Sequence, residues 1–195
     1  MRITGGEFSG RRITAPRGSA TRPTTDKVRA AIFNILRHAD FAPGLHGARI
    51  LDLFAGSGAL GLEAASHGAC FVLFVDASAA ARAAIRANVE ALGLGGMSRI
   101  WRRDATRMGR CAPMRPFDLA FLDPPYGKGL GKKALEALAS GGWLKPGALA
   151  VLEESARAQL ALPSRFTPMD VRDYGGTRVH FLRFGNLDSP GEIPA

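Results

Sequence analysis

The sequence is poor in cysteine and histidine and lacks any long apolar stretch. Its two cysteines, Cys70 and Cys111, form no CxxC pair, and its four histidines have no metal-ligand spacing, so no disulfide framework or metal centre is indicated. The longest apolar run, residues 69–75, is far too short to cross a bilayer, and residues 1–10 contain no signal-peptide stretch. We therefore expect a cytoplasmic protein with no metal and no membrane contact.

Acidic residues are also scarce relative to basic ones. The 195 residues carry 26 Lys and Arg against 17 Asp and Glu, which gives a formal net charge of +9. Such an excess favours a polyanionic partner, because phosphates attract Lys and Arg at long range. The apolar fraction is 46%, so the chain can build a sizeable core within one domain.

The hydrophobic pattern from residue 49 onward alternates between short apolar strands and helices. Because strands that alternate with helices form right-handed crossovers, this pattern predicts an α/β fold with a Rossmann-like parallel sheet, covered by helices on both faces. Residues 166–172 and 178–184 flank a glycine turn and predict an antiparallel pair at one sheet edge. The expected strands span residues 50–54, 71–75, 99–103, 117–122 and 148–153, and the expected helices span 58–66, 77–92 and 130–139.

The two ends of the chain differ from this central pattern. Residues 1–40 read as a basic extension, with short strands at 3–4 and 11–14 and then a helix that Thr24 or Thr25 can cap. We expect the main domain to span residues 41–187. The Pro- and Gly-containing tail, residues 188–195, is expected to be disordered.

A glycine loop follows the first predicted strand of the main domain. The strand carries Asp52 and is followed by the loop, in which glycines permit a tight turn and close approach of a ligand to a helix N-terminus. Asp76 comes 20 residues after the first glycine, where an acid binds ribose hydroxyls. This G-x-G-x-x-G pattern fits NAD and S-adenosylmethionine alike. The residues that we expect at the cofactor are Asp52, Phe54, Ala55, Gly56, Ser57, Gly58 and Asp76.

Two further acidic positions favour S-adenosylmethionine over NAD. Asp52 lies inside the strand, where a buried carboxylate needs a partner such as the ammonium of a methionine moiety. Asp104 follows the third strand, where its carboxylate can accept a hydrogen bond from an adenine amine. A loop or capping role is the other reading of Asp104.

The tetrapeptide Asp123-Pro124-Pro125-Tyr126 follows the fourth predicted strand and carries the chemistry. An exocyclic amine of a base is a poor nucleophile, and two acceptors on its hydrogens favour a pyramidal nitrogen whose lone pair faces a methyl donor. The Asp123 carboxylate and the Pro124 carbonyl suit this task, and Pro125 helps to stiffen their backbone. Tyr126 can stack on a base turned out of its helix or loop.

Together these motifs resemble the bacterial 16S ribosomal RNA guanine-N2 methyltransferases of the RsmD type. The resemblance covers residues 2–184, and its most specific part is Arg22-Pro23-Thr24-Thr25-Asp26-Lys27-Val28-Arg29. It implies a class I methyltransferase domain with an N-terminal extension, S-adenosylmethionine as cofactor, and one guanine of the small ribosomal subunit as target. It also implies that residues 22–29, with Thr25, close over the cofactor or meet RNA. Asp76 stands where many members have Glu, and Tyr126 where some have Phe.

Basic residues concentrate in the first 30 positions. We interpret this extension as a surface that binds RNA phosphates of 16S ribosomal RNA, within the small subunit. The residues assigned to this surface are Arg2, Arg11, Arg12, Arg22, Lys27 and Arg29.

Three other functions remain open at this point. An adenine-N6 methyltransferase acting on DNA or RNA would use the same tetrapeptide, which does not choose the base by itself. An NAD-dependent oxidoreductase would use the glycine pattern but leaves Asp123 to Tyr126 unexplained. A non-catalytic RNA-binding protein on a methyltransferase scaffold would bind RNA without transferring a methyl group.

Overall fold

A seven-stranded sheet forms the centre of the protein, in a computed structural model that describes residues 1–16 and 26–185. The sheet order is β3-β2-β1-β4-β5-β7-β6. Predictions for Arg22, Thr25 and the tail 188–195 lie outside the described residues. The strands are β1 (Arg49–Leu53), β2 (Phe71–Val75), β3 (Ser98–Trp101), β4 (Phe117–Leu122), β5 (Leu144–Ser155), β6 (Phe166–Tyr174) and β7 (Thr177–Phe184).

The first five strands are parallel, and β7 runs antiparallel to its neighbours β5 and β6. This arrangement confirms the predicted parallel sheet with an antiparallel pair at one edge. Helices connect β1 to β2, β2 to β3 and β4 to β5, whereas a loop without a helix connects β3 to β4. The helices of the described residues are α1 (Asp26–His38), α2 (Ala59–Ser66), α3 (Ala79–Ala91) and α4 (Leu130–Gly141), with a 3₁₀ turn η1 (Gly95–Met97) before β3.

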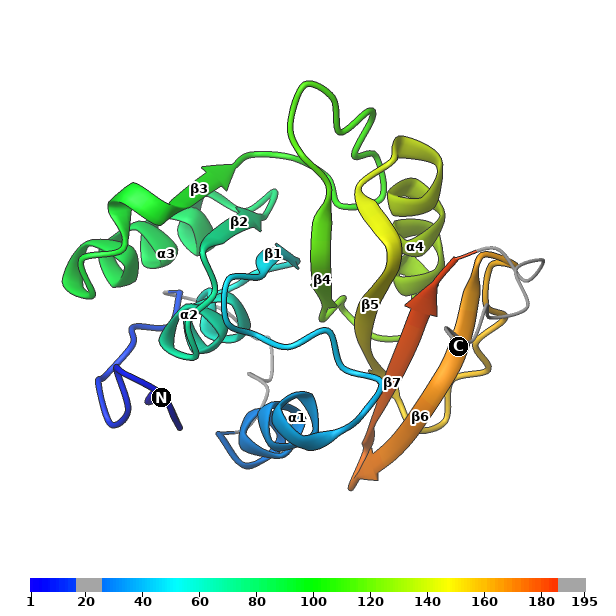
Figure 1. Ribbon diagram of the computed structural model, residues 1–195, viewed down its shortest axis with the longest axis horizontal. Coiled ribbons are helices and arrows are strands. Elements are labelled where there is room, and N and C mark those ends of the chain that lie inside the picture. Colours follow the sequence, from blue (N-terminus) through cyan, green and yellow to red (C-terminus); the bar gives the residue numbers. More distant parts are fainter. Residues whose placement is uncertain (17–25, 186–195) are drawn as a thin grey trace, which may run out of the picture.

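Helices cover both faces of the sheet, and each face has its own apolar core. Figure 1 shows α1, α2 and α3 on one side, and α4 with the loop after β3 on the other. On β1, Ile50 belongs to the core under α1–α3, whereas Leu51 and Leu53 belong to the core under α4. Successive side chains of a strand point to opposite faces, which is why the buried strands are continuously apolar.

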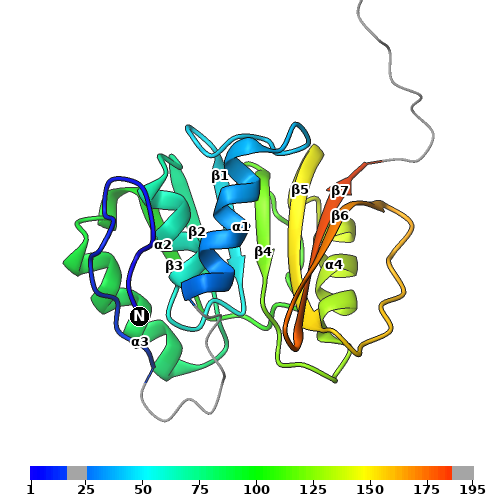
Figure 2. The same cartoon turned by 90° about the horizontal axis from the view of Figure 1, so that it is seen from below.

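The N-terminal segment lies against α2 and α3 (Figure 2) and is joined to the rest by apolar packing. Ile3 and Ile13 are buried in the same core as α1 and α2. The prediction of two short strands here is only partly right, because pairing is limited to one antiparallel bridge between Arg2 and Arg12. The Ile3 N–H donates to the Arg11 carbonyl at 3.0 Å, so the segment still forms a hairpin-like loop.

The largest differences from the predicted strand bounds are at the end of β3 and the start of β5. β3 ends at Trp101, because Arg102 and Arg103 already belong to the loop that follows. β5 begins at Leu144, four residues earlier than expected, and its pairing with β4 shifts register between Phe117 and Leu119. Proline and glycine at positions 146 and 147 hid this start, since both residues are unusual inside a strand.

Within residues 1–16 and 26–185, no helix is long and apolar enough to cross a membrane. The same residues contain no group of three or more His, Cys, Asp or Glu side chains placed to hold a metal ion.

Candidate active site

A cavity of about 1020 Å³ opens at the carboxyl ends of the parallel strands. In open α/β sheets this edge is where ligands bind. The cavity brings together most of the residues that the sequence assigned to cofactor and target base, from the ends of β1, β2, β3 and β4. These lining residues are Asp52, Phe54, Ala55, Gly56, Ser57, Asp76, Asp104, Asp123, Pro124, Pro125 and Tyr126. Gly58 lies beside the cavity as the N-cap of α2.

The loop between β1 and α2 contains several residues in the left-handed backbone conformation, which is unfavourable for most residue types. Phe54 has φ 56°, in the left-handed region, and Gly56 and Gly58 have φ 57° and 78°. A left-handed non-glycine residue costs free energy and is found where the surroundings fix it, often at functional sites. The loop is fixed here by Asp76, whose Oδ2 accepts from the Gly56 N–H at 2.9 Å and whose Oδ1 accepts from the Ser78 N–H at 2.7 Å.

Asp52 is 1% exposed and lies beneath this loop. Its Oδ2 accepts from the Gly61 N–H of α2 at 2.9 Å. Burial raises the pKa of Asp52 well above its ordinary value; the Gly61 hydrogen bond lowers that pKa, and nearby Asp123 and Asp76 raise it further. A buried carboxylate in this state favours a cationic ligand, whose charge would offset the neighbouring acids.

Asp104 is exposed near the start of the loop that leaves β3. Its Oδ1 accepts from both the N–H and the hydroxyl of Thr106, each at 2.8 Å. These bonds, the backbone one first, lower the pKa of Asp104 and keep its carboxylate ionised. The structure therefore gives Asp104 a turn-capping bond and also places it on the cavity wall.

The Asp123-Pro124-Pro125-Tyr126 segment follows β4 and forms part of the cavity wall. Tyr126 is 39% exposed, and its hydroxyl lies 3.0 Å from the Thr177 hydroxyl at the start of β7. This bond joins the end of β4 to the β6–β7 turn. The aromatic face of Tyr126 is thereby held at the cavity mouth.

Other cavity residues carried no functional assignment from the sequence. Glu153 at the end of β5, and Tyr174 and Thr177 at the β6–β7 turn, extend the wall beyond Tyr126. Glu153 sits in a run that reads as an ordinary apolar strand, so only its charge could have singled it out.

A buried carboxylate, Glu63 of α2, ties the N-terminal segment and α1 to the main domain. It accepts from the N–H groups of Thr4 and Gly5 and from the Thr4 hydroxyl, at 2.7–2.9 Å. It also pairs with the Arg29 Nε at 2.9 Å, with both side chains fully buried. Arg29 further binds Asp26 and the Arg2 carbonyl.

The interpretation of Arg29 as an RNA-binding residue is therefore wrong for this arrangement. Its guanidinium is 0% exposed and engaged by Glu63 and Asp26, so it is not available to RNA phosphates. Arg2, Arg11, Arg12 and Lys27 are all exposed. Arg2 donates to the Gly10 carbonyl and Arg11 to the Ala91 carbonyl, each at 2.7 Å.

Asn88 of α3 links the N-terminal segment to the glycine loop. Its side chain pairs with the N–H and carbonyl of Thr14 at 2.8 and 2.9 Å, and donates to the Ser57 carbonyl at 2.9 Å. The next residues, Ala15 and Pro16, line the cavity. One buried amide thus fixes both the glycine loop and the segment that borders it.

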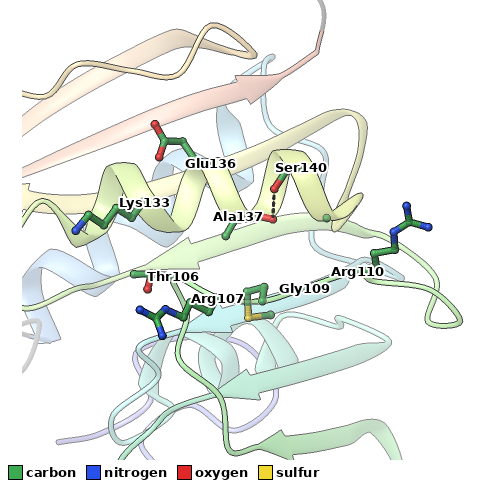
Figure 3. A pocket seen from close by; sticks show the side chains of 10 residues that line it. Thr106, Arg107, Gly109, Arg110, Lys133, Glu136, Ala137 and Ser140 are labelled. Atoms are coloured by element: carbon green, nitrogen blue, oxygen red, sulfur yellow. Dashed lines mark hydrogen bonds between the residues drawn. The ribbon is translucent and has the colours of Figure 1, made fainter.

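A second cavity of about 660 Å³ lies between α4 and the loop after β3 (Figure 3). Arg107, Arg110 and Lys133 line it together with Glu136. It holds none of the residues that the sequence assigned to the cofactor or the base, so we place the chemistry in the larger cavity.

The sheet order, the antiparallel β7 and the cavity at the glycine loop define the class: a Rossmann-like class I methyltransferase. A protein-family model described as "Conserved hypothetical protein 95" matches residues 1–183. The chain belongs to this family, and the predicted RsmD-type family is confirmed. Relatives of the chain are named as methyltransferases, which does not fit the NAD-dependent oxidoreductase alternative.

Relatives and solved structures agree with this assignment. The chain is 36% identical to ribosomal RNA small subunit methyltransferase D of Escherichia coli, over 78% of this chain and 74% of that protein. It is 30% identical to the protein of the same name from Haemophilus influenzae, over 90% and 89% of the two chains. The solved structure of the Escherichia coli methyltransferase yhhF superposes with TM-score 0.80 at 30% identity, covering 95% of this chain and 98% of that one.

Proposed function

We propose that this protein transfers a methyl group from S-adenosylmethionine to the exocyclic N2 amine of a guanine in 16S ribosomal RNA of the small subunit, in the cytoplasm. The observation that carries the proposal is that Asp123–Tyr126 and the glycine loop open on one cavity. The names of the relatives, which are ribosomal RNA small subunit methyltransferases, support the class of substrate.

The cavity residues fit S-adenosylmethionine. The cavity volume of about 1020 Å³ suits a nucleoside cofactor together with a base. The acidic residues of the cavity lie where they can bind the different parts of that cofactor. Asp76 and Asp104 would hold the ribose and the adenine amine, and Asp52 would offset the ammonium. When bound, the cofactor supplies an electrophilic methyl group on a sulfonium.

The task of the protein is then to hold the amine in line with that methyl group. Asp123 and the Pro124 carbonyl accept the two hydrogens of the amine and direct the nitrogen lone pair away from the ring. The amine becomes acidic only as it is alkylated, so Asp123 need not be a strong base; it passes the released proton to solvent. Tyr126 stacks on the base and excludes water from one side.

The test is transfer of a labelled methyl group from S-adenosylmethionine to small ribosomal subunits, followed by nucleoside mass spectrometry. The subunits come from cells that lack a methyltransferase of this family. We expect N2-methylguanosine. N6-methyladenosine would keep the class of enzyme and overturn the base. Equal RNA binding with and without cofactor and no methylated product would support the non-catalytic alternative.

A further inference from the structure

Glu153 lies beside Asp123 on the neighbouring strand. Leu122 of β4 pairs with Leu152 of β5, so residues 123 and 153 occupy the next register position of two parallel strands. Phe121 and Val151, two residues earlier on each strand, belong to the same core, so Asp123 and Glu153 extend from the same face of the sheet. Neighbouring strands are about 4.8 Å apart, which places two carboxyl groups along one wall of the cavity.

The surroundings of Glu153 are those of a binding wall. In the sheet order β4-β5-β7, Glu153 sits between the strand that leads to Tyr126 and the strand that begins at Thr177. The bond between the Tyr126 and Thr177 hydroxyls links the segments on either side of β5. Glu153 is 2% exposed and lines the cavity. Burial chiefly raises the pKa of the Tyr126 phenol, and the charges of Asp123, Glu153 and Glu154 raise it further.

The next residue, Glu154, provides a comparison for Glu153 on the same strand. It is also buried, at 4% exposed, but it extends from the opposite face, where Leu152 belongs to the α4 core. Its Oε1 accepts from the Ser155 N–H at 2.9 Å, and it does not line the cavity. The two glutamates share strand, charge and burial, and differ in the side of the sheet that they face.

We propose that Glu153 selects guanine by accepting the N1–H of the base whose exocyclic amine is held by Asp123 and Pro124. Guanine carries its N1–H and its N2 amine on adjacent atoms of one edge. Two carboxylates on neighbouring strands are suited to receive that pair of donors. This inference rests on the proposed function and adds a cause for the choice of base.

The same wall disfavours adenine. Adenine has an exocyclic amine, but the adjacent ring nitrogen N1 carries a lone pair and no hydrogen. With the amine at Asp123, that lone pair would face the Glu153 carboxylate, which can only accept when ionised. A buried acceptor opposed by another acceptor costs free energy, so discrimination follows without any contact to the rest of the ring.

The experiment compares wild type, Glu153→Gln and the matched control Glu154→Gln on small subunits that carry the target guanosine. We expect Glu153→Gln to lower kcat/KM for N2-methylguanosine on the order of tenfold, because the amide forms a weaker, uncharged hydrogen bond. The Kd for S-adenosylmethionine should not change, and the denaturation midpoint should not fall below that of wild type. We expect Glu154→Gln to stay within about threefold of wild type in kcat/KM.

A second substrate separates base selection from structural damage. In subunits reconstituted with 2-aminopurine riboside at the target position, the exocyclic amine is kept and N1 carries a lone pair. We expect wild type to prefer guanosine on the order of 10–100-fold. Glu153→Gln should lower this ratio on the order of tenfold relative to wild type, since its amide can donate to the lone pair. Intrinsic reactivity of the two bases cancels when the ratios of two enzymes are compared.

The outcomes distinguish a failure of the role of Glu153 from a failure of the proposed function. An unchanged ratio in Glu153→Gln, with N2-methylguanosine formed by wild type, would overturn the role of Glu153 and leave the proposed function intact. If wild type forms no N2-methylguanosine, the proposed function and the base selection fall together.

Discussion

At the residue scale, the cavity is lined by five acidic residues, and three of them lie close together. Asp52, Asp76 and Asp123 are close enough for the last two to raise the pKa of Asp52, on top of the larger effect of burial. The site without ligand therefore holds unfavourable negative charge. A bound cationic ligand would compensate this negative charge.

Replacing Asp52 by Asn tests this charge through stability. Because the pKa of Asp52 is raised, the native state binds more protons than the unfolded state, and its contribution to stability falls as pH rises from its unfolded pKa toward the raised one. We expect Asp52→Asn without ligand to match or exceed the wild-type denaturation midpoint at pH 8, with a smaller gain at pH 4, and to bind S-adenosylmethionine more weakly. A lower midpoint at pH 8 would contradict this reading.

Asp123 is expected to act in transfer and not in cofactor binding. Asp123→Ala removes one of two acceptors for the target amine, so we expect the rate of methyl transfer to fall on the order of 100- to 1000-fold. The Kd for S-adenosylmethionine, measured by calorimetry, should stay near wild type. The exposed Asp40→Ala serves as control. Loss of cofactor binding in Asp123→Ala would refute the assigned role.

Gly61 is required by close packing between α2 and the sheet. A Cβ built on Gly61 would lie 2.4 Å from Phe74 Cε1 and 2.8 Å from Val72 Cγ1. We expect Gly61→Ala to lower the free energy of unfolding by about 1–3 kcal/mol in urea denaturation. Gly96→Ala, where nothing lies within 4 Å, is the matched control and should change it little. Equal stability of the two variants would show that the helix can shift.

At the element scale, the sequence predicts an element well when burial alone decides its structure. β1, β2 and β4 lie close to their predicted bounds, because a strand buried on both faces must be continuously apolar. The N-terminal strands were predicted from local pattern, and the structure reduces them to one bridge. The burial of Arg29 was beyond local pattern, because its partner Glu63 lies 34 residues away.

The contact of α1 with α2 through Arg29 and Glu63 predicts a strong coupling between the two helices. Glu63→Ala leaves a buried guanidinium and two N–H groups without their acceptor, so we expect a loss of about 3–5 kcal/mol in the free energy of unfolding. Urea denaturation of wild type, Arg29→Met, Glu63→Met and the double variant gives the coupling, and we expect the double variant to lose less than the sum of the two single variants. Additive losses would mean that the pair is not coupled.

At the scale of the whole molecule, parallel topology assembles the site. Residues far apart in sequence meet because the carboxyl ends of parallel strands share one edge, which is why Asp52, Asp76, Asp104 and Asp123 could be grouped from strand order. Glu153 follows the same rule and was still not singled out. The sequence alone does not say which of two buried glutamates at the end of β5 faces the cavity.

The basic N-terminal surface predicts the salt dependence of RNA association. Arg11 and Arg12 are exposed, so replacing both by Ala should reduce the slope of log K against log salt by about one for each RNA phosphate that they neutralise. Arg165→Ala is the control, since its guanidinium donates to the Ala139 carbonyl near the end of α4, away from the cavity edge. A slope that does not change in the double variant would remove these arginines from the RNA interface.

The Asn88 side chain that binds both Thr14 and Ser57 has a consequence for engineering. The N-terminal segment cannot be treated as a detachable module, although it precedes the catalytic domain in the chain. A truncation that removes residues 1–16 would take away the Thr4 and Gly5 donors of the Glu63 carboxylate and the Thr14 partner of the Asn88 amide. A functional chimaera between relatives would have to exchange this segment together with the surfaces of α2 and α3 that receive it.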